Sequence, residues 1–285
     1  MLLTSLFLIS AIASEPTKSV DSEIFVSAGN FHAEIEGPAT DKQGNLFAVN
    51  VGGADPSNRG TIGKVTPDGK VSLHLRLPEG SIGNGIRFDQ QGAMYIADYT
   101  AHKIWRFADN QLTVFSHEPA MHQPNDLAIT QRGVLFASDP DWKNRQGQLW
   151  RIDTSGKAEL VEGQMGTTNG VEVSPDQQRL YVNESAQRRV WVFQLDADLR
   201  PSNKQLFHQF EDFGLDGMRS DAAGNLYIAR YGKGVIAKLS PTGELLREFQ
   251  LQSKFPTNVT FSPDQRYLYV TMQKEGAIER IDLQQ

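Results

Sequence analysis

The sequence predicts an all-β protein, a six-bladed β-propeller with four-stranded antiparallel blades, and three observations carry this prediction. One pattern of a polar residue, a short apolar strand, a turn and a second apolar strand occurs six times in the 285 residues. The polar residues that open the copies stand 41 to 48 residues apart, which is the length of a propeller blade. No segment shows the sustained apolar period of an amphipathic helix.

Each copy opens on a carboxylate or carboxamide side chain, which we call the anchor of its blade. The anchors are Glu36, Asn84, Asn125, Asn169, Asp216 and Asn258. The copies read EGPATDKQGNLFAVN, NGIRFDQQGAMYIAD, NDLAITQRGVLFASD, NGVEVSPDQQRLYVNE, DGMRSDAAGNLYIAR and NVTFSPDQRYLYVT. Their second halves are rich in β-branched and aromatic residues and follow turn residues, as the second strands of hairpins do. We therefore expect each anchor just before the innermost strand of a blade.

Further strands complete the blades and close the ring. Outer strands are predicted at 103–107, 148–152, 190–195, 235–240 and 245–251. The last copy supplies strands at 256–261, 266–272 and 277–282, one fewer than a blade needs. The segment EIFVSAG at 23–29 is predicted to supply the missing strand, so that the N-terminal strand closes the ring and covers an open edge. Because no linker or composition shift interrupts the copies, residues 23–285 are predicted to form one domain.

Composition excludes several classes of protein. With Lys+Arg 28 against Asp+Glu 34, the net charge is −6, and no basic run occurs, so nucleic acid is not expected as a partner. The chain has no cysteine, which excludes a disulfide framework, a catalytic thiol, Cys-ligated zinc and an iron–sulfur cluster. Neither a G-x-S-x-G nucleophile elbow nor a Walker loop is present.

The N-terminus carries a short apolar run, LLTSLFLISAIA at 2–13, that ends in an A-x-A pattern. This pattern is typical of a cleaved signal peptide, although no Lys or Arg precedes the run, and a buried first strand or helix is the alternative. We predict a signal peptide at 1–13, a short tail at 14–22 and a secreted or periplasmic protein. No membrane span is expected, because the run is too short and no later segment approaches the necessary apolar length.

The anchors should form a metal site. Equivalent positions of the blades lie equally far from the axis of a propeller, so the anchors should converge at one mouth of the channel. Glu36 and Asp216 would repel each other there without a cation between them, and the asparagines add neutral oxygens. This set suits a hard divalent cation such as Ca²⁺, with Mg²⁺, Mn²⁺ and Zn²⁺ as alternatives. For Asn84 and Asn258, an Asx-turn at the strand entry is an equal alternative.

The segments EGPATDKQGNLF, PNDLAI, TTNGVEVSPDQQRLYV, LDGMRSDAAGNLYIARYGKG and PTNVTFSPDQRYLYVT resemble the SMP-30/gluconolactonase/LRE family of six-bladed propellers. The resemblance implies a divalent cation, usually Ca²⁺, on the axis and hydrolysis of lactones or organophosphates. It implies that Glu36, Asn169 and Asp216 hold the cation, and that Asn125 contacts the cation or the substrate. Animal gluconolactonases use an Arg on the sugar at the position of Gln123, so this chain departs from their pattern, which leaves sugar-lactone specificity open.

The predicted function is a divalent-cation-dependent hydrolase that opens small-molecule lactones, with organophosphates as a second substrate class. Asp216 is the predicted catalytic residue, acting either as general base or as nucleophile. The residues predicted to bind substrate are Asn125, Gln123, Asn84 and Arg230. Two other functions stay open: a non-catalytic NHL-like binding propeller, and a propeller lyase or strictosidine-synthase-like enzyme.

Overall fold

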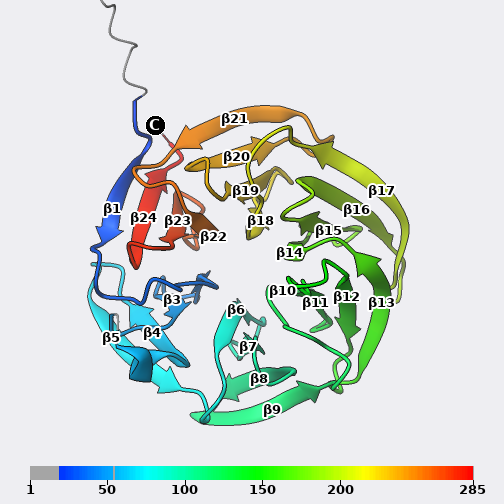
Figure 1. Ribbon diagram of the computed structural model, residues 1–285, viewed down its shortest axis with the longest axis horizontal. Coiled ribbons are helices and arrows are strands. Elements are labelled where there is room, and N and C mark those ends of the chain that lie inside the picture. Colours follow the sequence, from blue (N-terminus) through cyan, green and yellow to red (C-terminus); the bar gives the residue numbers. More distant parts are fainter. Residues whose placement is uncertain (1–18, 54, 285) are drawn as a thin grey trace, which may run out of the picture.

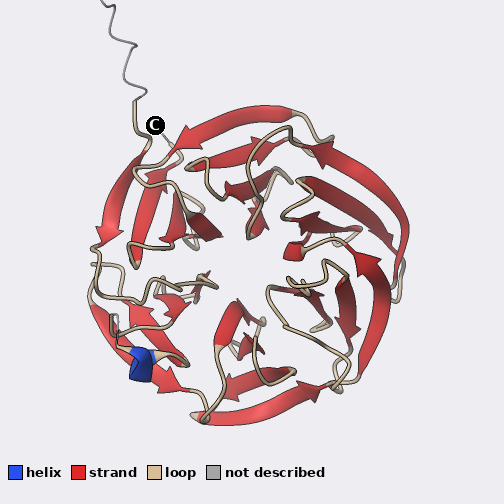
Figure 2. Cartoon of the chain, in the orientation of Figure 1, coloured by secondary structure: helices blue, strands red, loops and turns tan. Residues whose placement is uncertain are grey.

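The computed structural model describes residues 19–53 and 55–284, which form six four-stranded antiparallel sheets set around a central axis (Figure 1). This confirms the predicted all-β propeller. The predicted signal peptide at 1–13 lies outside the described residues. Within them, the helical structure is one short 3₁₀ turn, η1 (Pro56–Asn58), in the first blade (Figure 2). The described chain contains no helix long and apolar enough to cross a membrane.

The blades are numbered in chain order, and the strands of each run outward from the axis. Blade 1 consists of β2 (Ala39–Thr40), β3 (Leu46–Val49), β4 (Thr61–Val65) and β5 (Val71–Arg76), and blade 2 of β6 (Gly83–Phe88), β7 (Met94–Asp98), β8 (Lys103–Ala108) and β9 (Gln111–His117). Blade 3 consists of β10 (Leu127–Ile129), β11 (Leu135–Asp139), β12 (Gly147–Ile152) and β13 (Ala158–Met165), and blade 4 of β14 (Thr168–Val173), β15 (Arg179–Glu184), β16 (Arg189–Leu195) and β17 (Pro201–Gln209). Blade 5 consists of β18 (Met218–Ser220), β19 (Leu226–Arg230), β20 (Val235–Leu239) and β21 (Leu245–Gln250), and blade 6 of β22 (Pro256–Phe261), β23 (Tyr267–Met272), β24 (Ala277–Asp282) and β1 (Ser22–Val26).

Asx-turns join the first and second strands of several blades. In blade 1, the Asp41 carboxylate accepts hydrogen bonds from the backbone N–H groups of Gln43 (3.0 Å) and Asn45 (2.8 Å), and Gly44 has a φ of +82°. Asp89 in blade 2 and Asp221 in blade 5 hold the corresponding turns in the same way. These aspartates turn the chain back antiparallel to the first strand, so each hairpin begins and ends at the same face of the ring.

The ring closes through β1, which pairs antiparallel with β24 and lies beside it in Figure 1. The predicted closure by the N-terminal strand is confirmed, but the strand begins at Ser22, the last residue of the predicted tail. The Glu279 carboxylate, which is fully buried, accepts hydrogen bonds from the Ser22 hydroxyl (2.5 Å) and the backbone N–H of Gln252 (3.0 Å). The outer edge of β24 is thereby paired rather than exposed.

The apolar core lies between neighbouring blades rather than at the axis. One cluster packs Phe136 and Leu149 of blade 3 against Val171 and Val182 of blade 4, and all four side chains are buried. Corresponding clusters join the other blades. Close packing between sheets fixes the innermost strands, and polar side chains are left to line the channel.

Candidate active site

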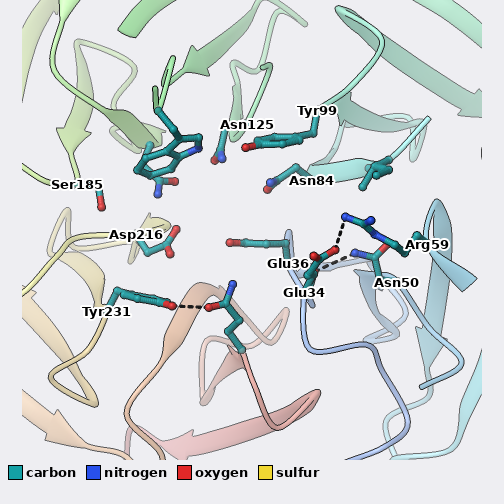
Figure 3. A pocket seen from close by; sticks show the side chains of 15 residues that line it. Glu34, Glu36, Asn50, Arg59, Asn84, Tyr99, Asn125, Ser185, Asp216 and Tyr231 are labelled. Atoms are coloured by element: carbon teal, nitrogen blue, oxygen red, sulfur yellow. Dashed lines mark hydrogen bonds and ion pairs between the residues drawn. The ribbon is translucent and has the colours of Figure 1, made fainter. Parts of the chain in front are cut away.

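A pocket of about 410 Å³ opens at one mouth of the channel, and every blade contributes to its wall (Figure 3). Its lining comprises Glu34, Glu36, Asn50, Arg59, Ile82, Gly83, Asn84, Tyr99, Asn125, Trp142, Asn169, Ser185, Asp216, Tyr231 and Gln273. Five of the anchors are in this lining: Glu36, Asn84, Asn125, Asn169 and Asp216. The structure therefore brings together Glu36, Asn125, Asn169 and Asp216, the residues that the family resemblance implies for the cation, whereas the anchor Asn258 does not line the pocket.

The position of each anchor in its strand explains this convergence. Asn84 and Asn169 lie inside the innermost strands β6 and β14, and Asp216 lies two residues before β18. The backbone N–H of Asp216 donates to the carbonyl of Ala229 (2.9 Å), so pairing with β19 begins before the first residue of β18. The side-chain amide of Asn183, from β15, donates to the Asp216 carbonyl (2.5 Å) and ties blade 4 to blade 5. Asp216 is thus held from its own blade and from a neighbouring one.

Glycines beside the anchors allow the blades to meet closely. Gly37 has a φ of +58°, and a Cβ added to it would lie 1.9 Å from the backbone oxygen of Asn84. Backbone atoms of two blades cannot move apart cheaply at this point, since both belong to the packed inner ring. Any side chain at position 37 would therefore displace the anchors on either side of it.

We expect the substitution Gly37→Ala to lower the free energy of unfolding by at least about 3 kcal/mol, through both steric overlap and left-handed strain. Gly80→Ala is the matched control, because Gly80 has a φ of +84° but no atom within 4 Å of its added Cβ. That variant should lose only about 1–2 kcal/mol. Chemical denaturation of both variants measures the difference, and equal losses would contradict the role given to close approach.

Burial controls the charge of the two acidic anchors. Burial, together with the nearby charge of Asp126, raises the pKa of Glu36 from 4.5 to about 8. Burial and the charge of Glu36 raise the pKa of Asp216 well above its ordinary value. Neither carboxylate forms an ion pair with a described residue, and Glu36 points across the pocket toward Asp216 (Figure 3). Both groups would be stabilised as anions by a cation placed between them.

Two amide oxygens in the pocket have no hydrogen-bond partner. The Oδ1 atoms of Asn84 and Asn169 are buried, and no donor among the described residues reaches them. A buried acceptor without a partner costs free energy, so these oxygens suit a ligand that the structure does not contain. Together with two carboxylates they make an all-oxygen donor set, which fits a hard divalent cation. Among residues 19–53 and 55–284, no three His, Cys, Asp or Glu side chains gather in a group that could hold a metal ion. The donor set in the pocket has only two carboxylates, and its other oxygens belong to asparagine amides.

The free Oδ1 of Asn84 also decides against an Asx-turn at that anchor. Asn258 differs: its Oδ1 accepts the backbone N–H of Val259 (2.9 Å) and a 3.4 Å hydrogen bond from Arg219. Asn258 does not line the pocket, although its side chain acts on Glu36 by lowering the pKa of that carboxyl against the effect of burial. Asn258 is therefore the one anchor that lies outside the pocket lining.

Four charged side chains form a belt in the channel next to the anchors. Asp126, with no exposed surface, lies between Arg87 (Oδ1 to Nη1, 3.1 Å) and Arg219 (Oδ2 to Nη1, 3.5 Å). Glu172 lies 4.0 Å from Arg87 and accepts a hydrogen bond from the Ser220 hydroxyl (2.9 Å). Two guanidinium groups thus face two carboxylates. The belt is balanced in charge and leaves the charges of Glu36 and Asp216 for a bound cation.

Much of the pocket rim was not predicted from the sequence, although the rim residues recur at one position of the repeat. The residue that follows the second strand of a blade lines the pocket in every blade except the third, namely Asn50, Tyr99, Ser185, Tyr231 and Gln273. The repeat that located the anchors therefore also locates the rim. The missed belt has a similar signal, because Arg87, Glu172 and Arg219 each stand three residues after an anchor.

Two residues predicted to bind substrate lie elsewhere. Arg230 is buried, its guanidinium donates to Asp212 (2.7 Å) and Glu248 (3.4 Å), and it stacks on Phe210. It does not line the pocket, because the last residue of β19 points away from the side to which Tyr231 points. Gln123 also stands behind the lining, where it contacts the rim residues Tyr99 and Trp142.

Comparisons with known proteins agree with this geometry. The chain is 31% identical to the 6-deoxy-6-sulfogluconolactonase of Pseudomonas putida over 231 residues, 76% of this chain and 77% of that protein. It is 28% identical to the gluconolactonase of Zymomonas mobilis over 249 residues, 74% of this chain and 68% of that one. The fold is similar to that of a calcium-binding protein, regucalcin, from Agrobacterium tumefaciens, with a TM-score of 0.75, 20% identity and coverage of 90% of this chain and 94% of that one. The sequence model of the SMP-30/Gluconolactonase/LRE-like region matches residues 36–274, and this chain belongs to that family.

Proposed function

We propose that this protein is a divalent-cation-dependent hydrolase that opens lactone rings in the pocket at the mouth of the channel. The observation that carries the proposal is the donor set on the axis: two carboxylates without a cationic partner and two buried amide oxygens without a donor. Two lactonases among the relatives support the lactone as substrate class, and a calcium-binding protein of the same fold supports Ca²⁺ as the cation.

The ligands proposed for the cation are Glu36, Asn169, Asp216 and Asn125, all of which line the pocket. Asn84 has an equally free amide oxygen and is available either to the cation or to the substrate. When bound, a divalent cation would supply a Lewis acid that withdraws electron density from the carbonyl oxygen of the lactone. The buried surroundings of the site strengthen that electrostatic effect, because little water competes with it.

Asp216 is the residue that we propose acts on the attacking group. As general base, its carboxylate takes a proton from the water that adds to the carbonyl carbon; as nucleophile, it adds to that carbon itself. In the first route the ring C–O bond breaks, the ring oxygen takes up the proton that Asp216 removed from water, and a hydroxy acid leaves. In the second route the ring C–O bond breaks to leave a mixed anhydride with Asp216, and a water then hydrolyses it, which supplies the proton of the new hydroxyl, releases the hydroxy acid and restores Asp216. Asn183 supports Asp216 by holding its backbone carbonyl (2.5 Å), so the carboxylate is presented from a fixed strand end.

The test is proton release from a panel of γ-, δ- and sugar lactones together with one phosphofluoridate. Each compound is assayed with Ca²⁺-loaded and chelator-stripped protein after spontaneous hydrolysis is subtracted. Ca²⁺-dependent turnover of a lactone supports the proposal, and turnover of the phosphofluoridate alone would move it to organophosphates. No turnover of any compound, with Ca²⁺ still raising the melting temperature, would leave a binding propeller with a structural cation.

The pKa of Glu36 predicts how stability should depend on pH in chelator-stripped protein. Folded Glu36 keeps its proton up to about pH 8, whereas the unfolded chain releases it near 4.5. The folded state therefore binds more protons in this interval, and the free energy of unfolding should fall as pH rises from about 5 to about 8. Added Ca²⁺ should reverse that trend, because it replaces the proton.

Melting temperatures measured across this pH range, with and without Ca²⁺, check the expectation. Glu36→Gln is the control, since an amide cannot titrate and should reduce the dependence in stripped protein to the part that Asp216 contributes. A melting temperature that rises with pH in stripped wild-type protein would contradict the burial of an uncompensated Glu36 carboxylate.

A further inference from the structure

The side chain of Gln123 connects two aromatic residues of the pocket wall. Tyr99 follows the second strand of blade 2, and Trp142 lies in the loop between β11 and β12 of blade 3. The hydroxyl of Tyr99 points toward Asn125, that is, toward the anchors rather than toward the outer rim (Figure 3). Gln123 stands behind this wall, and its backbone N–H is fixed by a 2.7 Å hydrogen bond to the Asp139 carboxylate.

Hydrogen-bond chemistry fixes the orientation of the Gln123 amide. Its Oε1 accepts the backbone N–H of Trp142 (3.3 Å), and its Nε2 donates to the hydroxyl oxygen of Tyr99 (2.9 Å). A backbone N–H can only donate, so the oxygen of the amide has to face Trp142. The NH₂ group is then the part that faces Tyr99. A flipped amide would place its NH₂ against the backbone N–H of Trp142, one donor against another.

This orientation makes the Tyr99 oxygen an acceptor and leaves its proton free. A hydroxyl has one proton to donate, and no acceptor among the described residues receives it from Tyr99. Burial and the charge of Glu34 raise the pKa of Tyr99, so the hydroxyl keeps this proton at physiological pH. Tyr99 is half-buried and lines the pocket, so this free donor faces the space that a ligand would fill and can meet a ligand oxygen there.

Tyr231, on the opposite wall, has the reverse arrangement. Its hydroxyl donates to the Oε1 of Gln273, so its proton is already used within the protein (Figure 3). The pocket therefore contains two tyrosine–glutamine pairs of opposite hydrogen-bond direction. Only the Tyr99 pair presents a hydroxyl proton to a ligand.

We propose that Tyr99 donates a hydrogen bond to an oxygen of the bound lactone and that Gln123 is the positioning residue that directs this donor. The inference rests on the lactone hydrolysis proposed above. It assigns Gln123 a role through Tyr99, in place of the direct substrate contact predicted from the sequence. The pocket thereby selects ligands with an acceptor oxygen on the side of blades 2 and 3.

Gln123→Glu tests the direction of the hydrogen bond to Tyr99, because it changes that direction without changing the size of the side chain. The carboxylate is isosteric, keeps an acceptor for the N–H of Trp142, and turns the second contact into an acceptor for the Tyr99 proton. The proton would then be held by residue 123 and lost to the substrate. We expect Gln123→Glu and Tyr99→Phe each to lower kcat/KM about tenfold on the lactone that wild type turns over best. Tyr267→Phe, the matched control outside the pocket, should change kcat/KM less than about twofold.

The double variant Tyr99→Phe/Gln123→Glu separates direction from charge. If Gln123 acts through Tyr99, adding the carboxylate to Tyr99→Phe should not lower kcat/KM further. If the charge of the carboxylate itself lowered kcat/KM, the full tenfold loss would appear again in the double variant. Melting temperatures of all four variants show whether the fold is kept. Wild-type kcat/KM in Tyr99→Phe, or in Gln123→Glu, would overturn the inference.

The lactam of the same ring provides a readout that does not require turnover. It keeps the carbonyl acceptor but is not opened, so its binding should weaken about tenfold in Tyr99→Phe and Gln123→Glu and stay unchanged in Tyr267→Phe, outside the pocket. Wild-type protein that turns over no lactone would refute the proposed function. Active wild type with unaltered lactam binding in both variants would refute only the role of Tyr99 and Gln123.

Discussion

Asp216→Asn should lower lactone turnover by about 10³-fold or more without destabilising the cation-free fold. The catalytic loss follows because an amide neither accepts the proton of water nor adds to a carbonyl, and it removes one charge from the cation ligands. The stability result follows from burial: Asp216 is 8% exposed and faces the charge of Glu36, which raises its pKa. An amide is neutral at every pH, so in stripped protein the substitution removes a buried acid whose ionisation would cost free energy.

The matched control for this variant is Asp221→Asn, which removes the same charge in the same blade. Asp221 holds the turn after β18 through the backbone N–H of Asn225 (2.9 Å), and an Asn side chain can keep that bond. Its activity should match wild type within about twofold. Initial rates with and without Ca²⁺, together with thermal melts in chelator, give both readouts. Full activity in Asp216→Asn would refute the catalytic role.

Arg219→Met should lower the free energy of unfolding by about 3–5 kcal/mol, the largest loss we expect from a single side chain of the channel. Arg219 is buried, pairs with Asp126 (3.5 Å) and donates to the carbonyls of Met218 (2.7 Å) and Pro38 (3.3 Å). Its loss would leave four carboxylates near the axis, Glu36, Asp126, Glu172 and Asp216, with Arg87 as the remaining guanidinium of the belt.

Arg247→Met makes the same chemical change in an exposed ion pair of the same blade. Arg247 contacts Asp21 at 2.7 Å with about half of its side chain exposed to solvent, so its loss should cost less than about 1 kcal/mol. Denaturant unfolding of both variants measures the two losses. Similar small losses would show that the belt contributes no more than a surface pair and would contradict its charge-balancing role.

The ring and the anchors could be predicted because both are periodic properties of the sequence. A strand–turn–strand unit that recurs every 41 to 48 residues has few ways to bury its faces other than beside its own copies. The anchors occupy the same position in each repeat, so they meet at one mouth of the channel. The structure shows this for Glu36, Asn84, Asn125, Asn169 and Asp216. Glu279 and Ser22, whose strands seal the ring, lie 257 residues apart. The strand missing from the last copy, rather than any local pattern, predicted that the segment at 23–29 pairs there.

Arg230, Gln123 and the belt lie where the sequence did not place them, because the direction of a side chain and its partners from distant segments decide their positions. Arg230 and Tyr231 are adjacent, yet only Tyr231 reaches the pocket, because strand geometry sends successive side chains to opposite sides. The partners of Gln123 are 24 and 19 residues distant and belong to two different loops, so no local pattern predicts which end of its amide faces which group. The belt around Asp126 was missed because its arginines and acids meet across the channel.

The most direct measurement is the rate of lactone hydrolysis as Ca²⁺ is added back to chelator-stripped protein, recorded beside the calorimetric binding isotherm of the same sample. We expect activity to rise from background with a midpoint equal to the calorimetric Kd, with one ion bound per chain, and both signals to be absent in Glu36→Gln. Stripped protein that hydrolyses lactones at the full rate, or Glu36→Gln that binds Ca²⁺ as wild type does, would contradict a cation-dependent lactonase centred on these anchors.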